Sequence, residues 1–419
     1  MIKLKRIHFL TASLIVILFP VFLGAAGLPP YQKYQGSIKP GVVITKENLP
    51  QYEEELKSLL PASRHYWFFD LGLKRGLFTV PVQETKFFPP SPGFVAASKK
   101  NVGKCKLGPN NELLNWEAGT PFPEAKTASE IVWNCYPEVS HATSHDDLDF
   151  YARYNFYNHE GKYEKHFDWI LYKKKYTGRT DIPPYPNLEE ATSKGILSKE
   201  IIAVLVPHDV KGFIQMRVRY WDINKADEVY AYLPALRRLR RLTGSDVCDP
   251  IMGSDMPYDD YETWRQKLTP RMRFKLLGTK DFLVPATYTK MPDNMLKAKG
   301  LLFQINWEIR PLYILEIVTN DPDYMYSKRV LYIDATTEGH WTIYWGEGYD
   351  QRGRLWRALG ATPIAHVTWE GISGFRNLYG YVITNVQTNH FSNAWGLPKF
   401  YALDPEKTFS VKGMLKKAR

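Results

Sequence analysis

Two histidines and two aspartates lie close together in the chain, at His141, His145, Asp146 and Asp147. Imidazole and carboxylate groups are ligands that zinc accepts in proteins. A helical zinc-protease motif also places a glutamate between its histidines, and this segment has none. Phosphate-loop, dinucleotide-binding and Gly-x-Ser-x-Gly patterns are absent from the sequence as well. We therefore expect no metal, no cofactor and no catalytic residue, although a triad assembled from distant residues stays open.

The densest basic run consists of Arg237, Arg238, Leu239, Arg240 and Arg241. On a strand, Arg238 and Arg240 would share one face, and the other three residues would share the opposite face. Guanidinium groups arranged in this way suit carboxylates or lipid phosphates. Nucleic acid is the usual partner of a basic patch, but the secretion signal described below argues against that partner.

An acidic segment follows the arginine run and contains five aspartates between Asp246 and Asp260. Clustered carboxylates are compatible with calcium, but the EF-hand spacing of acidic residues is absent. We favour ion pairs between these aspartates and the arginines. This interpretation predicts a structural or docking group formed by Arg237, Arg238, Arg240, Arg241, Asp255, Tyr258, Asp259 and Asp260.

Residues 1–26 are typical of a secretory signal peptide. Lys3, Lys5 and Arg6 precede an apolar stretch over 9–23, and small residues follow it at 24–26. The alternative is an uncleaved anchor helix, but the stretch is shorter than the roughly 20 residues that span a bilayer. No cysteine occurs in the first hundred residues that could carry a lipid. We therefore expect a periplasmic protein that is neither anchored nor lipidated.

The composition is that of a folded globular protein, with 419 residues, 44% hydrophobic residues, 24% charged residues and a net charge of +11. These values exclude a disordered chain, a collagen-like chain and a multi-span membrane protein. The cysteines are too few for a disulfide-dense scaffold. They permit one bond, for which Cys105 and Cys135 are the local choice, or three free thiols including Cys248.

Proline and glycine patterns divide the mature chain. Residues 27–146 are rich in both, and we predict that they wrap over a surface and contain two helices. Asn48 is the expected cap of the first helix, and Thr127 with Glu130 forms a capping box for the second. Residues 147–395 have the alternation of strands, and residues 396–419 form a basic tail.

Apolar and polar residues alternate strictly in several segments of the region 147–395. Such alternation is typical of antiparallel strands with one apolar face. About ten strands at short spacing favour one large, strongly curved antiparallel sheet. The apolar faces either form a packed core or line a cavity. The residues on these faces are Ile214, Met216, Val218, Phe303, Ile305, Trp307, Ile309, Trp341, Ile343 and Trp345.

Several motifs carry a family resemblance. The run from Tyr232 to Arg241, followed by Met252-Gly253-Ser254-Asp255-Met256-Pro257-Tyr258-Asp259-Asp260, resembles a signature of periplasmic LolA-like proteins. The longer chain resembles the domain of unknown function 1329 family within that superfamily of outer-membrane lipoprotein-sorting proteins. The resemblance implies an α+β, β-rich fold: a LolA/LppX-like half-barrel with plugging helices, which holds lipid between sheet and helices. It also implies resistance-nodulation-division exporters or outer-membrane proteins as partners.

These observations lead to one functional hypothesis and two alternatives. The leading hypothesis is a periplasmic carrier or chaperone that binds a lipid or other hydrophobic molecule, without catalysis and without nucleic acid. The apolar strand faces named above would line its cavity. The alternatives are an extracytoplasmic hydrolase, which would need a titratable pair in a polar cleft, and a carbohydrate-binding protein, which would expose its aromatic residues.

Overall fold

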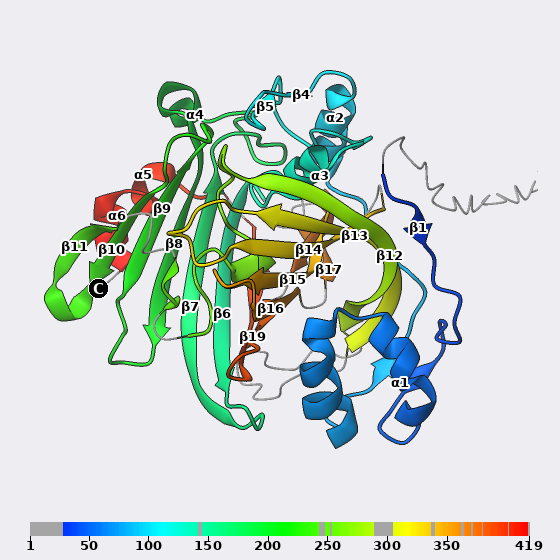
Figure 1. The fold of residues 1–419 in the computed structure, drawn as a ribbon. Coiled ribbons are helices and arrows are strands. Elements are labelled where there is room, and N and C mark those ends of the chain that lie inside the picture. The colour runs from blue at the N-terminus through cyan, green and yellow to red at the C-terminus, as the bar shows by residue number, and fades with distance from the viewer. Residues whose placement is uncertain are drawn as a thin grey trace, which may run out of the picture.

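The computed structural model describes residues 28–140, 145–242, 248–251, 254–288, 305–336, 340–361, 364–369, 372–378, 380–400 and 402–417. The predicted signal peptide lies outside these ranges. The dominant element is one sheet of 14 strands in the order β1-β12-β13-β14-β15-β16-β19-β20-β6-β7-β8-β9-β10-β11 (Figure 1). Its strands are β1 (Tyr31–Gln32), β6 (Asp147–Tyr157), β7 (Tyr163–Lys175), β8 (Ile196–Val206), β9 (Ile214–Tyr220), β10 (Glu228–Leu233), β11 (Arg238–Leu242), β12 (Arg273–Tyr288), β13 (Ile305–Val318), β14 (Lys328–Asp334), β15 (Ile343–Tyr349), β16 (Leu355–Ala361), β19 (Gly380–Asn385) and β20 (His390–Lys399).

The sheet is built from two runs of neighbouring strands. The chain starts in the middle of the sheet with β6 and adds strands outward to β11. It then resumes at the opposite end with β12 and returns, so that β20 pairs with β6, with Phe391 opposite Tyr157. Neighbours are antiparallel except at β1, which is parallel to β12. β12 and β13 bend strongly along their length (Figure 1). The predicted fold class, an α+β, β-rich chain on a large curved antiparallel sheet, is confirmed.

Both predicted N-terminal helices are present. α3 (Ala128–Cys135) has the predicted capping box, in which Thr127 accepts from the Glu130 N–H and Glu130 accepts from the Thr127 N–H. α1 (Leu49–Ser58) begins after Asn48, but that side chain does not cap it. The Asn48 Oδ1 atom instead accepts from the Thr45 N–H at 2.7 Å. The capping role predicted for Asn48 is therefore wrong, because a preceding turn already uses its oxygen.

The sequence analysis missed several helices, two of them in this N-terminal part. α2 (Pro92–Asn101) starts inside the proline-rich stretch, where Pro92 occupies a first-turn position that needs no N–H and Ser91 caps the Phe94 N–H. A π-helix at Tyr66–Gly72 follows α1, and all of its residues except Tyr66 and Asp70 are buried. Short hairpins complete this part and a later insertion: β2 (Val43–Ile44) with β3 (Val80–Pro81), β4 (Lys106–Leu107) with β5 (Leu113–Leu114), and β17 (Ile364–Trp369) with β18 (Ile372–Leu378).

Helices and loops cover both faces of the sheet. On β14, Val330 and Tyr332 pack with α1 and the π-helix, whereas Leu331 and Ile333 pack with α3. Because side chains alternate across a strand, these two clusters lie on opposite faces. We call the face that carries Leu331 the plug face. Residues 254–268, named the plug here, pack on it between α3 and β6–β7.

The other end of the sheet is covered by different helices. On β7, Trp169 and Leu171 contact the plug, and Ile170 and Tyr172 face the opposite side. There α5 (Pro405–Thr408) and α6 (Val411–Lys417) pack beside β9, while α4 (Glu189–Lys194) lies beside β8 (Figure 1). Among the described helices, none is long and apolar enough to cross a membrane. The division at 147 and the basic tail over 396–419 stay predictions, and the described part of that tail contains the end of β20, α5 and α6.

Candidate functional site

The apolar residues predicted to line one cavity lie in separate clusters. Trp307 stacks on Trp345, with ring centroids 6.4 Å apart, in the core under α1 and the π-helix. Ile305 and Ile309 belong to the same core. Aromatic rings pack closely in this core. The ring of Phe68, from the π-helix, meets the Trp307 ring edge-on, with centroids 5.2 Å apart.

The remaining members of that set face other elements. Trp341 and Ile343 pack on the plug face near α3. Ile214 and Met216 pack against α6, and Val218 packs in a small cluster beside α4. Phe303 lies outside the described residues. The structure therefore does not bring these residues into one site, because alternation identifies the faces of each strand and not the element that covers a face.

The arginine run and the aspartates also lie apart. Arg237, at the turn before β11, and Arg238, Arg240 and Arg241, on β11, are exposed. The ion pair recorded for this run joins Arg241 Nη2 to Glu228 Oε1 on the adjacent strand, at 3.4 Å. The predicted network between these arginines and the downstream aspartates is not found among the described ion pairs. The reason is topological, since β11 is the end strand of the sheet and the plug crosses its middle.

The aspartates instead pair with arginines of the sheet. Asp259 accepts from the Tyr324 hydroxyl at 2.9 Å, and its carboxylate lies 3.5 Å from Arg217 Nη1. Asp260 pairs with Arg329 at 2.7 Å. Tyr258 is buried, and its ring lies 5.6 Å from the guanidinium carbon of Arg217. The plug residues of the predicted group thus do lie together, as anchors on the plug face.

A second set of buried charges anchors the next turn of the plug. Arg265 contacts Glu138 and also lies 2.8 Å from Glu200. Arg219 on β9 pairs with Asp227 at 2.9 Å. Burial raises the pKa of Glu138, but the charges of Arg265, Lys173 and Arg219 together outweigh this and hold that pKa below its usual range. Removing one partner of such a pair would leave an uncompensated buried charge. Sequence reasoning missed these groups, because they are single charged residues far apart along the chain, and no motif or regular spacing connects them.

His390 connects the start of the plug to the sheet. Its Nδ1 hydrogen-bonds the Asp255 carboxylate, and its Nε2 lies 2.9 Å from Glu164. Ser392 Oγ donates to the same Asp255 oxygen at 2.8 Å. The hydrogen bond that His390 donates to Asp255, followed by the one it donates to Glu164, raises the pKa of His390 to about 9. His390 is therefore a cation at neutral pH between two carboxylates.

The plug also contains strained backbone. Glu262 and Thr263 are adjacent and have φ values of 54° and 76°. The left-handed region is costly for a β-branched residue such as threonine. Glu262 and Thr263 keep this conformation between two anchored neighbours, Tyr261 and Arg265, whose side chains both reach Glu200. The plug is thus held by side-chain contacts and contains no regular helix of more than one turn.

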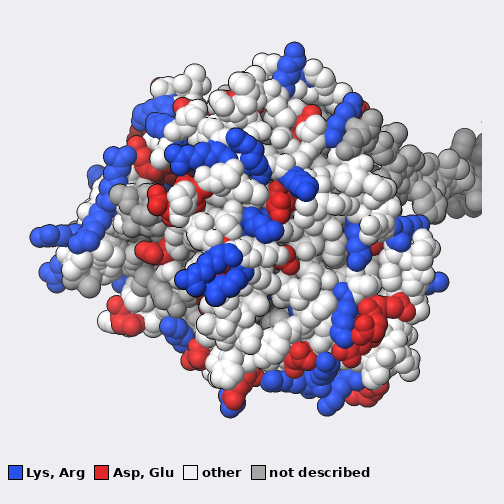
Figure 2. Space-filling model, in the orientation of Figure 1, with Lys and Arg blue, Asp and Glu red and all other residues white. Residues whose placement is uncertain are grey.

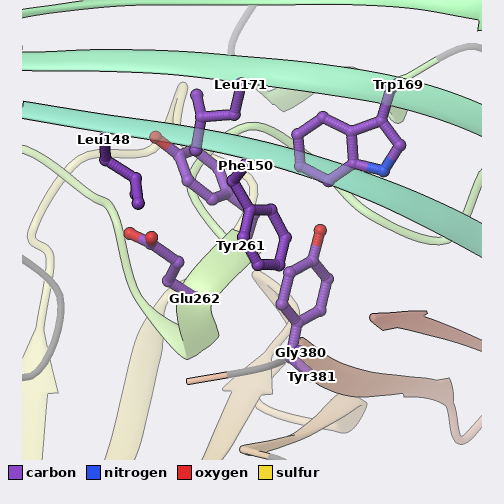
Figure 3. A pocket seen from close by; sticks show the side chains of 8 residues that line it. All are labelled: Leu148, Phe150, Trp169, Leu171, Tyr261, Glu262, Gly380 and Tyr381. Atoms are coloured by element: carbon purple, nitrogen blue, oxygen red, sulfur yellow. The ribbon is translucent and has the colours of Figure 1, made fainter. Parts of the chain in front are cut away.

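Two apolar cavities lie between the plug and strands β6–β8. They are small, with about 10 Å³ and 20 Å³ of space for a water-sized molecule, so a larger ligand would need the plug to move. Trp169 lines both. The first cavity (Figure 3) is lined by Leu148, Phe150, Trp169, Leu171, Tyr261, Glu262, Gly380 and Tyr381. The second is lined by Tyr154, Phe167, Trp169, Ile202, Val204, Ile251, Ser254 and Met256.

The first cavity contains few polar atoms. Tyr381 directs its hydroxyl toward the ring of Trp169 (Figure 3). Within the described part of the chain, neither this hydroxyl nor the Trp169 indole N–H has a hydrogen-bond partner. Burial raises the pKa of Tyr381 far above its usual value, so the phenol stays neutral. The lining is thus mainly apolar and aromatic. Its polar groups include these two and the Glu262 carboxylate, which pairs with Lys173 and Arg265. Such a lining suits a hydrophobic ligand better than acid–base chemistry.

The predicted histidine and aspartate cluster has structural contacts. Asp146 accepts from the backbone N–H groups of Thr180, Asp181 and Ile182, and so fixes a turn. Asp147 pairs with Lys174 and Arg179. His141 lies outside the described residues. No group of three or more potential metal ligands occurs in the described ranges.

The sequence profile of a family described as proteins of unknown function, DUF1329, matches residues 43–397. The chain belongs to the DUF1329 family. The family resemblance seen in the sequence motifs is confirmed. The matched range contains the plug and the strands β6 to β16 and β19 of the large sheet; it leaves out β1 and the last two residues of β20. An uncharacterized protein of Pseudomonas aeruginosa is 23% identical over 341 residues, which cover 78% of this chain and 70% of that protein.

Three solved structures are similar to this DUF1329 chain. A putative outer membrane lipoprotein-sorting protein domain from Vibrio parahaemolyticus is 19% identical, with a TM-score of 0.45 over 64% of this chain and 91% of that one. A DUF1329 family protein from Desulfovibrio piger is 16% identical, with a TM-score of 0.46 over 65% and 93%. A LolA superfamily protein from Nitrosomonas europaea is 12% identical, with a TM-score of 0.41 over 68% and 98%.

Proposed function

We propose that this DUF1329 protein is a periplasmic carrier or chaperone for a lipid or another hydrophobic molecule, and that it catalyses no reaction. The observation that carries the proposal is the pair of small apolar cavities between the plug and β6–β8, which share Trp169 in their lining. Their aromatic and aliphatic lining is the usual character of a site for apolar ligands.

Hydrophobic burial alone is strong enough to hold such a ligand. Each methylene removed from water contributes about 0.8 kcal/mol, so a 16-carbon chain would gain on the order of 10 kcal/mol before ordering costs. Tyr261, Trp169 and Leu171 are at most 5% exposed, so a ligand must displace part of the plug to enter. A chain longer than one cavity would run past Trp169 from the first cavity into the second.

The setting and partners belong to the same proposal. The first 26 residues have the pattern of a secretion signal, which supports the periplasm as the site of action. The resemblance to LolA-like proteins suggested an exporter of the resistance-nodulation-division class, or an outer-membrane protein, as the donor or acceptor of the ligand. A hydrolase would need a titratable pair facing these cavities, and Glu262 is the single carboxylate among their described lining residues.

Native mass spectrometry of protein purified from the periplasm without detergent tests the proposal. Organic extraction of the same sample identifies any bound material. We expect a stoichiometric adduct of lipid size. A clean apo mass that does not change after incubation with membrane extract would contradict a carrier function.

Cavity-filling variants locate the ligand. Leu171→Phe and Val204→Phe add atoms to the first and second cavity, and at least one should lower the occupancy of the adduct. Leu277→Phe is the matched control, because Leu277 is 45% exposed and lines neither cavity. Trp307→Ala tests the lining expected from sequence. Loss of the adduct in that variant alone would move the site to the core under α1.

A further inference from the structure

The hairpin of β10 and β11 projects from one end of the sheet. β11 is the last strand in the sheet order, and Figure 1 shows it at the edge of the molecule, far from α1. Its turn contains Pro234, Leu236 and Arg237, and Arg237 has a positive φ of 48° that reverses the chain. Residues 238–241 are all exposed, so both faces of this strand meet solvent.

The hairpin has a large excess of positive charge. Arg237, Arg238, Arg240 and Arg241 are exposed, and Figure 2 shows basic side chains standing out where β11 lies. Glu228 is the acidic partner recorded for them, through Arg241, whose side chain remains 66% exposed. α6 packs against β9 in the same core as Tyr230 and Tyr232 of β10, and it adds exposed Lys412 and Lys416 at this end.

Large apolar side chains are exposed among these charges. Leu236 is 51% exposed and Leu239 is 37% exposed, and Val411 at the start of α6 is 41% exposed. Arginines that protect an edge strand from aggregation would explain the charge but not the exposed leucines. A protein partner would need roughly 800 Å² on each side, and a projecting two-stranded tip offers little flat area. A membrane surface would explain both the charge and the exposed leucines. The leucines would enter the headgroup region, and the flanking arginines would contact lipid phosphates.

We propose that the β10–β11 hairpin docks on the surface of an anionic phospholipid bilayer. Leu236 and Leu239 enter the interface, and Arg237, Arg238, Arg240 and Arg241 bind lipid phosphates. The proposal goes beyond the carrier function and is independent of it, because the hairpin contributes no residue to the cavities at Trp169.

Vesicle flotation with the full-length mature protein tests this inference. The probes are phosphatidylcholine vesicles with and without 30% phosphatidylglycerol. We expect binding to the anionic vesicles that weakens as salt rises. Each arginine near an anionic surface contributes roughly a fivefold factor in affinity. The quadruple substitution of Arg237, Arg238, Arg240 and Arg241 by Gln should therefore weaken binding on the order of a hundredfold or more.

Two further variants separate docking from general charge attraction. The substitution of exposed Lys99, Lys100, Lys104 and Lys106 by Gln removes the same charge near α2, and it should change binding by less than about threefold. Leu236→Ser with Leu239→Ser should weaken binding while leaving the charge intact. Equal losses in the arginine and lysine variants, or no binding of the wild type to anionic vesicles, would overturn the proposal. If the arginine variant forms oligomers but binds vesicles as the wild type does, the proposal is also overturned. The arginines would then serve to keep the edge strand β11 from pairing with other chains.

The lipid content of the protein is a separate readout. A wild type that docks on vesicles but carries no adduct would contradict the carrier function and leave the docking inference intact. A protein that carries lipid but does not bind anionic vesicles would contradict the docking inference and leave the carrier function intact.

Discussion

Asp260 and Arg329 form an ion pair that is completely inaccessible to solvent, with Oδ1 and Nη2 2.7 Å apart. Asp260 belongs to the plug and Arg329 to β14. The Tyr326 hydroxyl donates to the second carboxylate oxygen of Asp260, and the Arg357 Nη1 donates to Tyr326 at 3.0 Å. Burial alone would lower the pKa of Arg329, but the Asp260 carboxylate together with Tyr324 and Tyr326 more than offsets this and raises the pKa. The plug is thus attached to two strands through one aspartate.

Replacing Asp260 should destabilise the fold strongly. Asp260→Asn leaves the Arg329 charge buried without its counter-ion, which costs about 3–5 kcal/mol of unfolding free energy. Urea denaturation followed by tryptophan fluorescence measures this change. Glu54→Gln is the control, because it breaks a pair with Lys57 in which the Glu54 side chain is 87% exposed. The control should shift stability by less than about 0.5 kcal/mol, and equal effects of the two variants would show that the buried pair is not an anchor.

His390 should make stability depend on alkaline pH. Its folded pKa of about 9 lies above the ordinary value of about 6.5. A raised pKa favours the protonated folded state, so the stabilisation is complete below about pH 6.5 and is lost as pH rises through about 9. Thermal melts across this range should therefore fall more steeply for wild type than for His390→Gln. Exposed His208→Gln should behave as wild type, and parallel curves for all three proteins would contradict the role of His390.

Tyrosine hydroxyls distinguish the cavity from the anchors. Tyr381→Phe removes a buried hydroxyl that has no partner among the described residues, so the variant should be neutral or slightly stabilised. Tyr326→Phe removes a donor to the Asp260 carboxylate, and hydrogen bonds to charged groups contribute about 1.5–3 kcal/mol. Urea midpoints of the two variants give the comparison. A Tyr381 variant that loses as much stability as the Tyr326 variant would mean that the cavity hydroxyl is bonded in solution.

The cysteines should be free and slow to react. Cys105, Cys135 and Cys248 are all free thiols in the structure. Burial raises the pKa of Cys105 to about 11 and raises the pKa values of Cys135 and Cys248 as well. Since the thiolate is the reactive form, thiol titration with Ellman's reagent near pH 8 should be slow in the folded protein. Unreduced protein in urea should release three thiols, and a value of one would reveal a disulfide.

Local patterns predicted much of the secondary structure. The capping box at Thr127 and Glu130 located α3, and the alternation from Ile305 onward located β13. These features involve neighbours within a few residues, so propensity and periodicity are enough to show them. The same reasoning missed α2, because Pro92, one of the prolines that indicated a loop, occupies the first helical position, where proline is favourable.

By itself, the sequence determined the family, the antiparallel strands and the composition of each strand face. Only the tertiary structure decided which groups meet. Arg265 and Glu138 are 127 residues apart along the chain, and Asp255 and His390 are 135 apart. Sequence reasoning paired the aspartates with the nearest arginines, whereas the fold pairs them with arginines of distant strands. Contacts of this kind depend on which element covers each face of the sheet, and local periodicity contains no information on that choice.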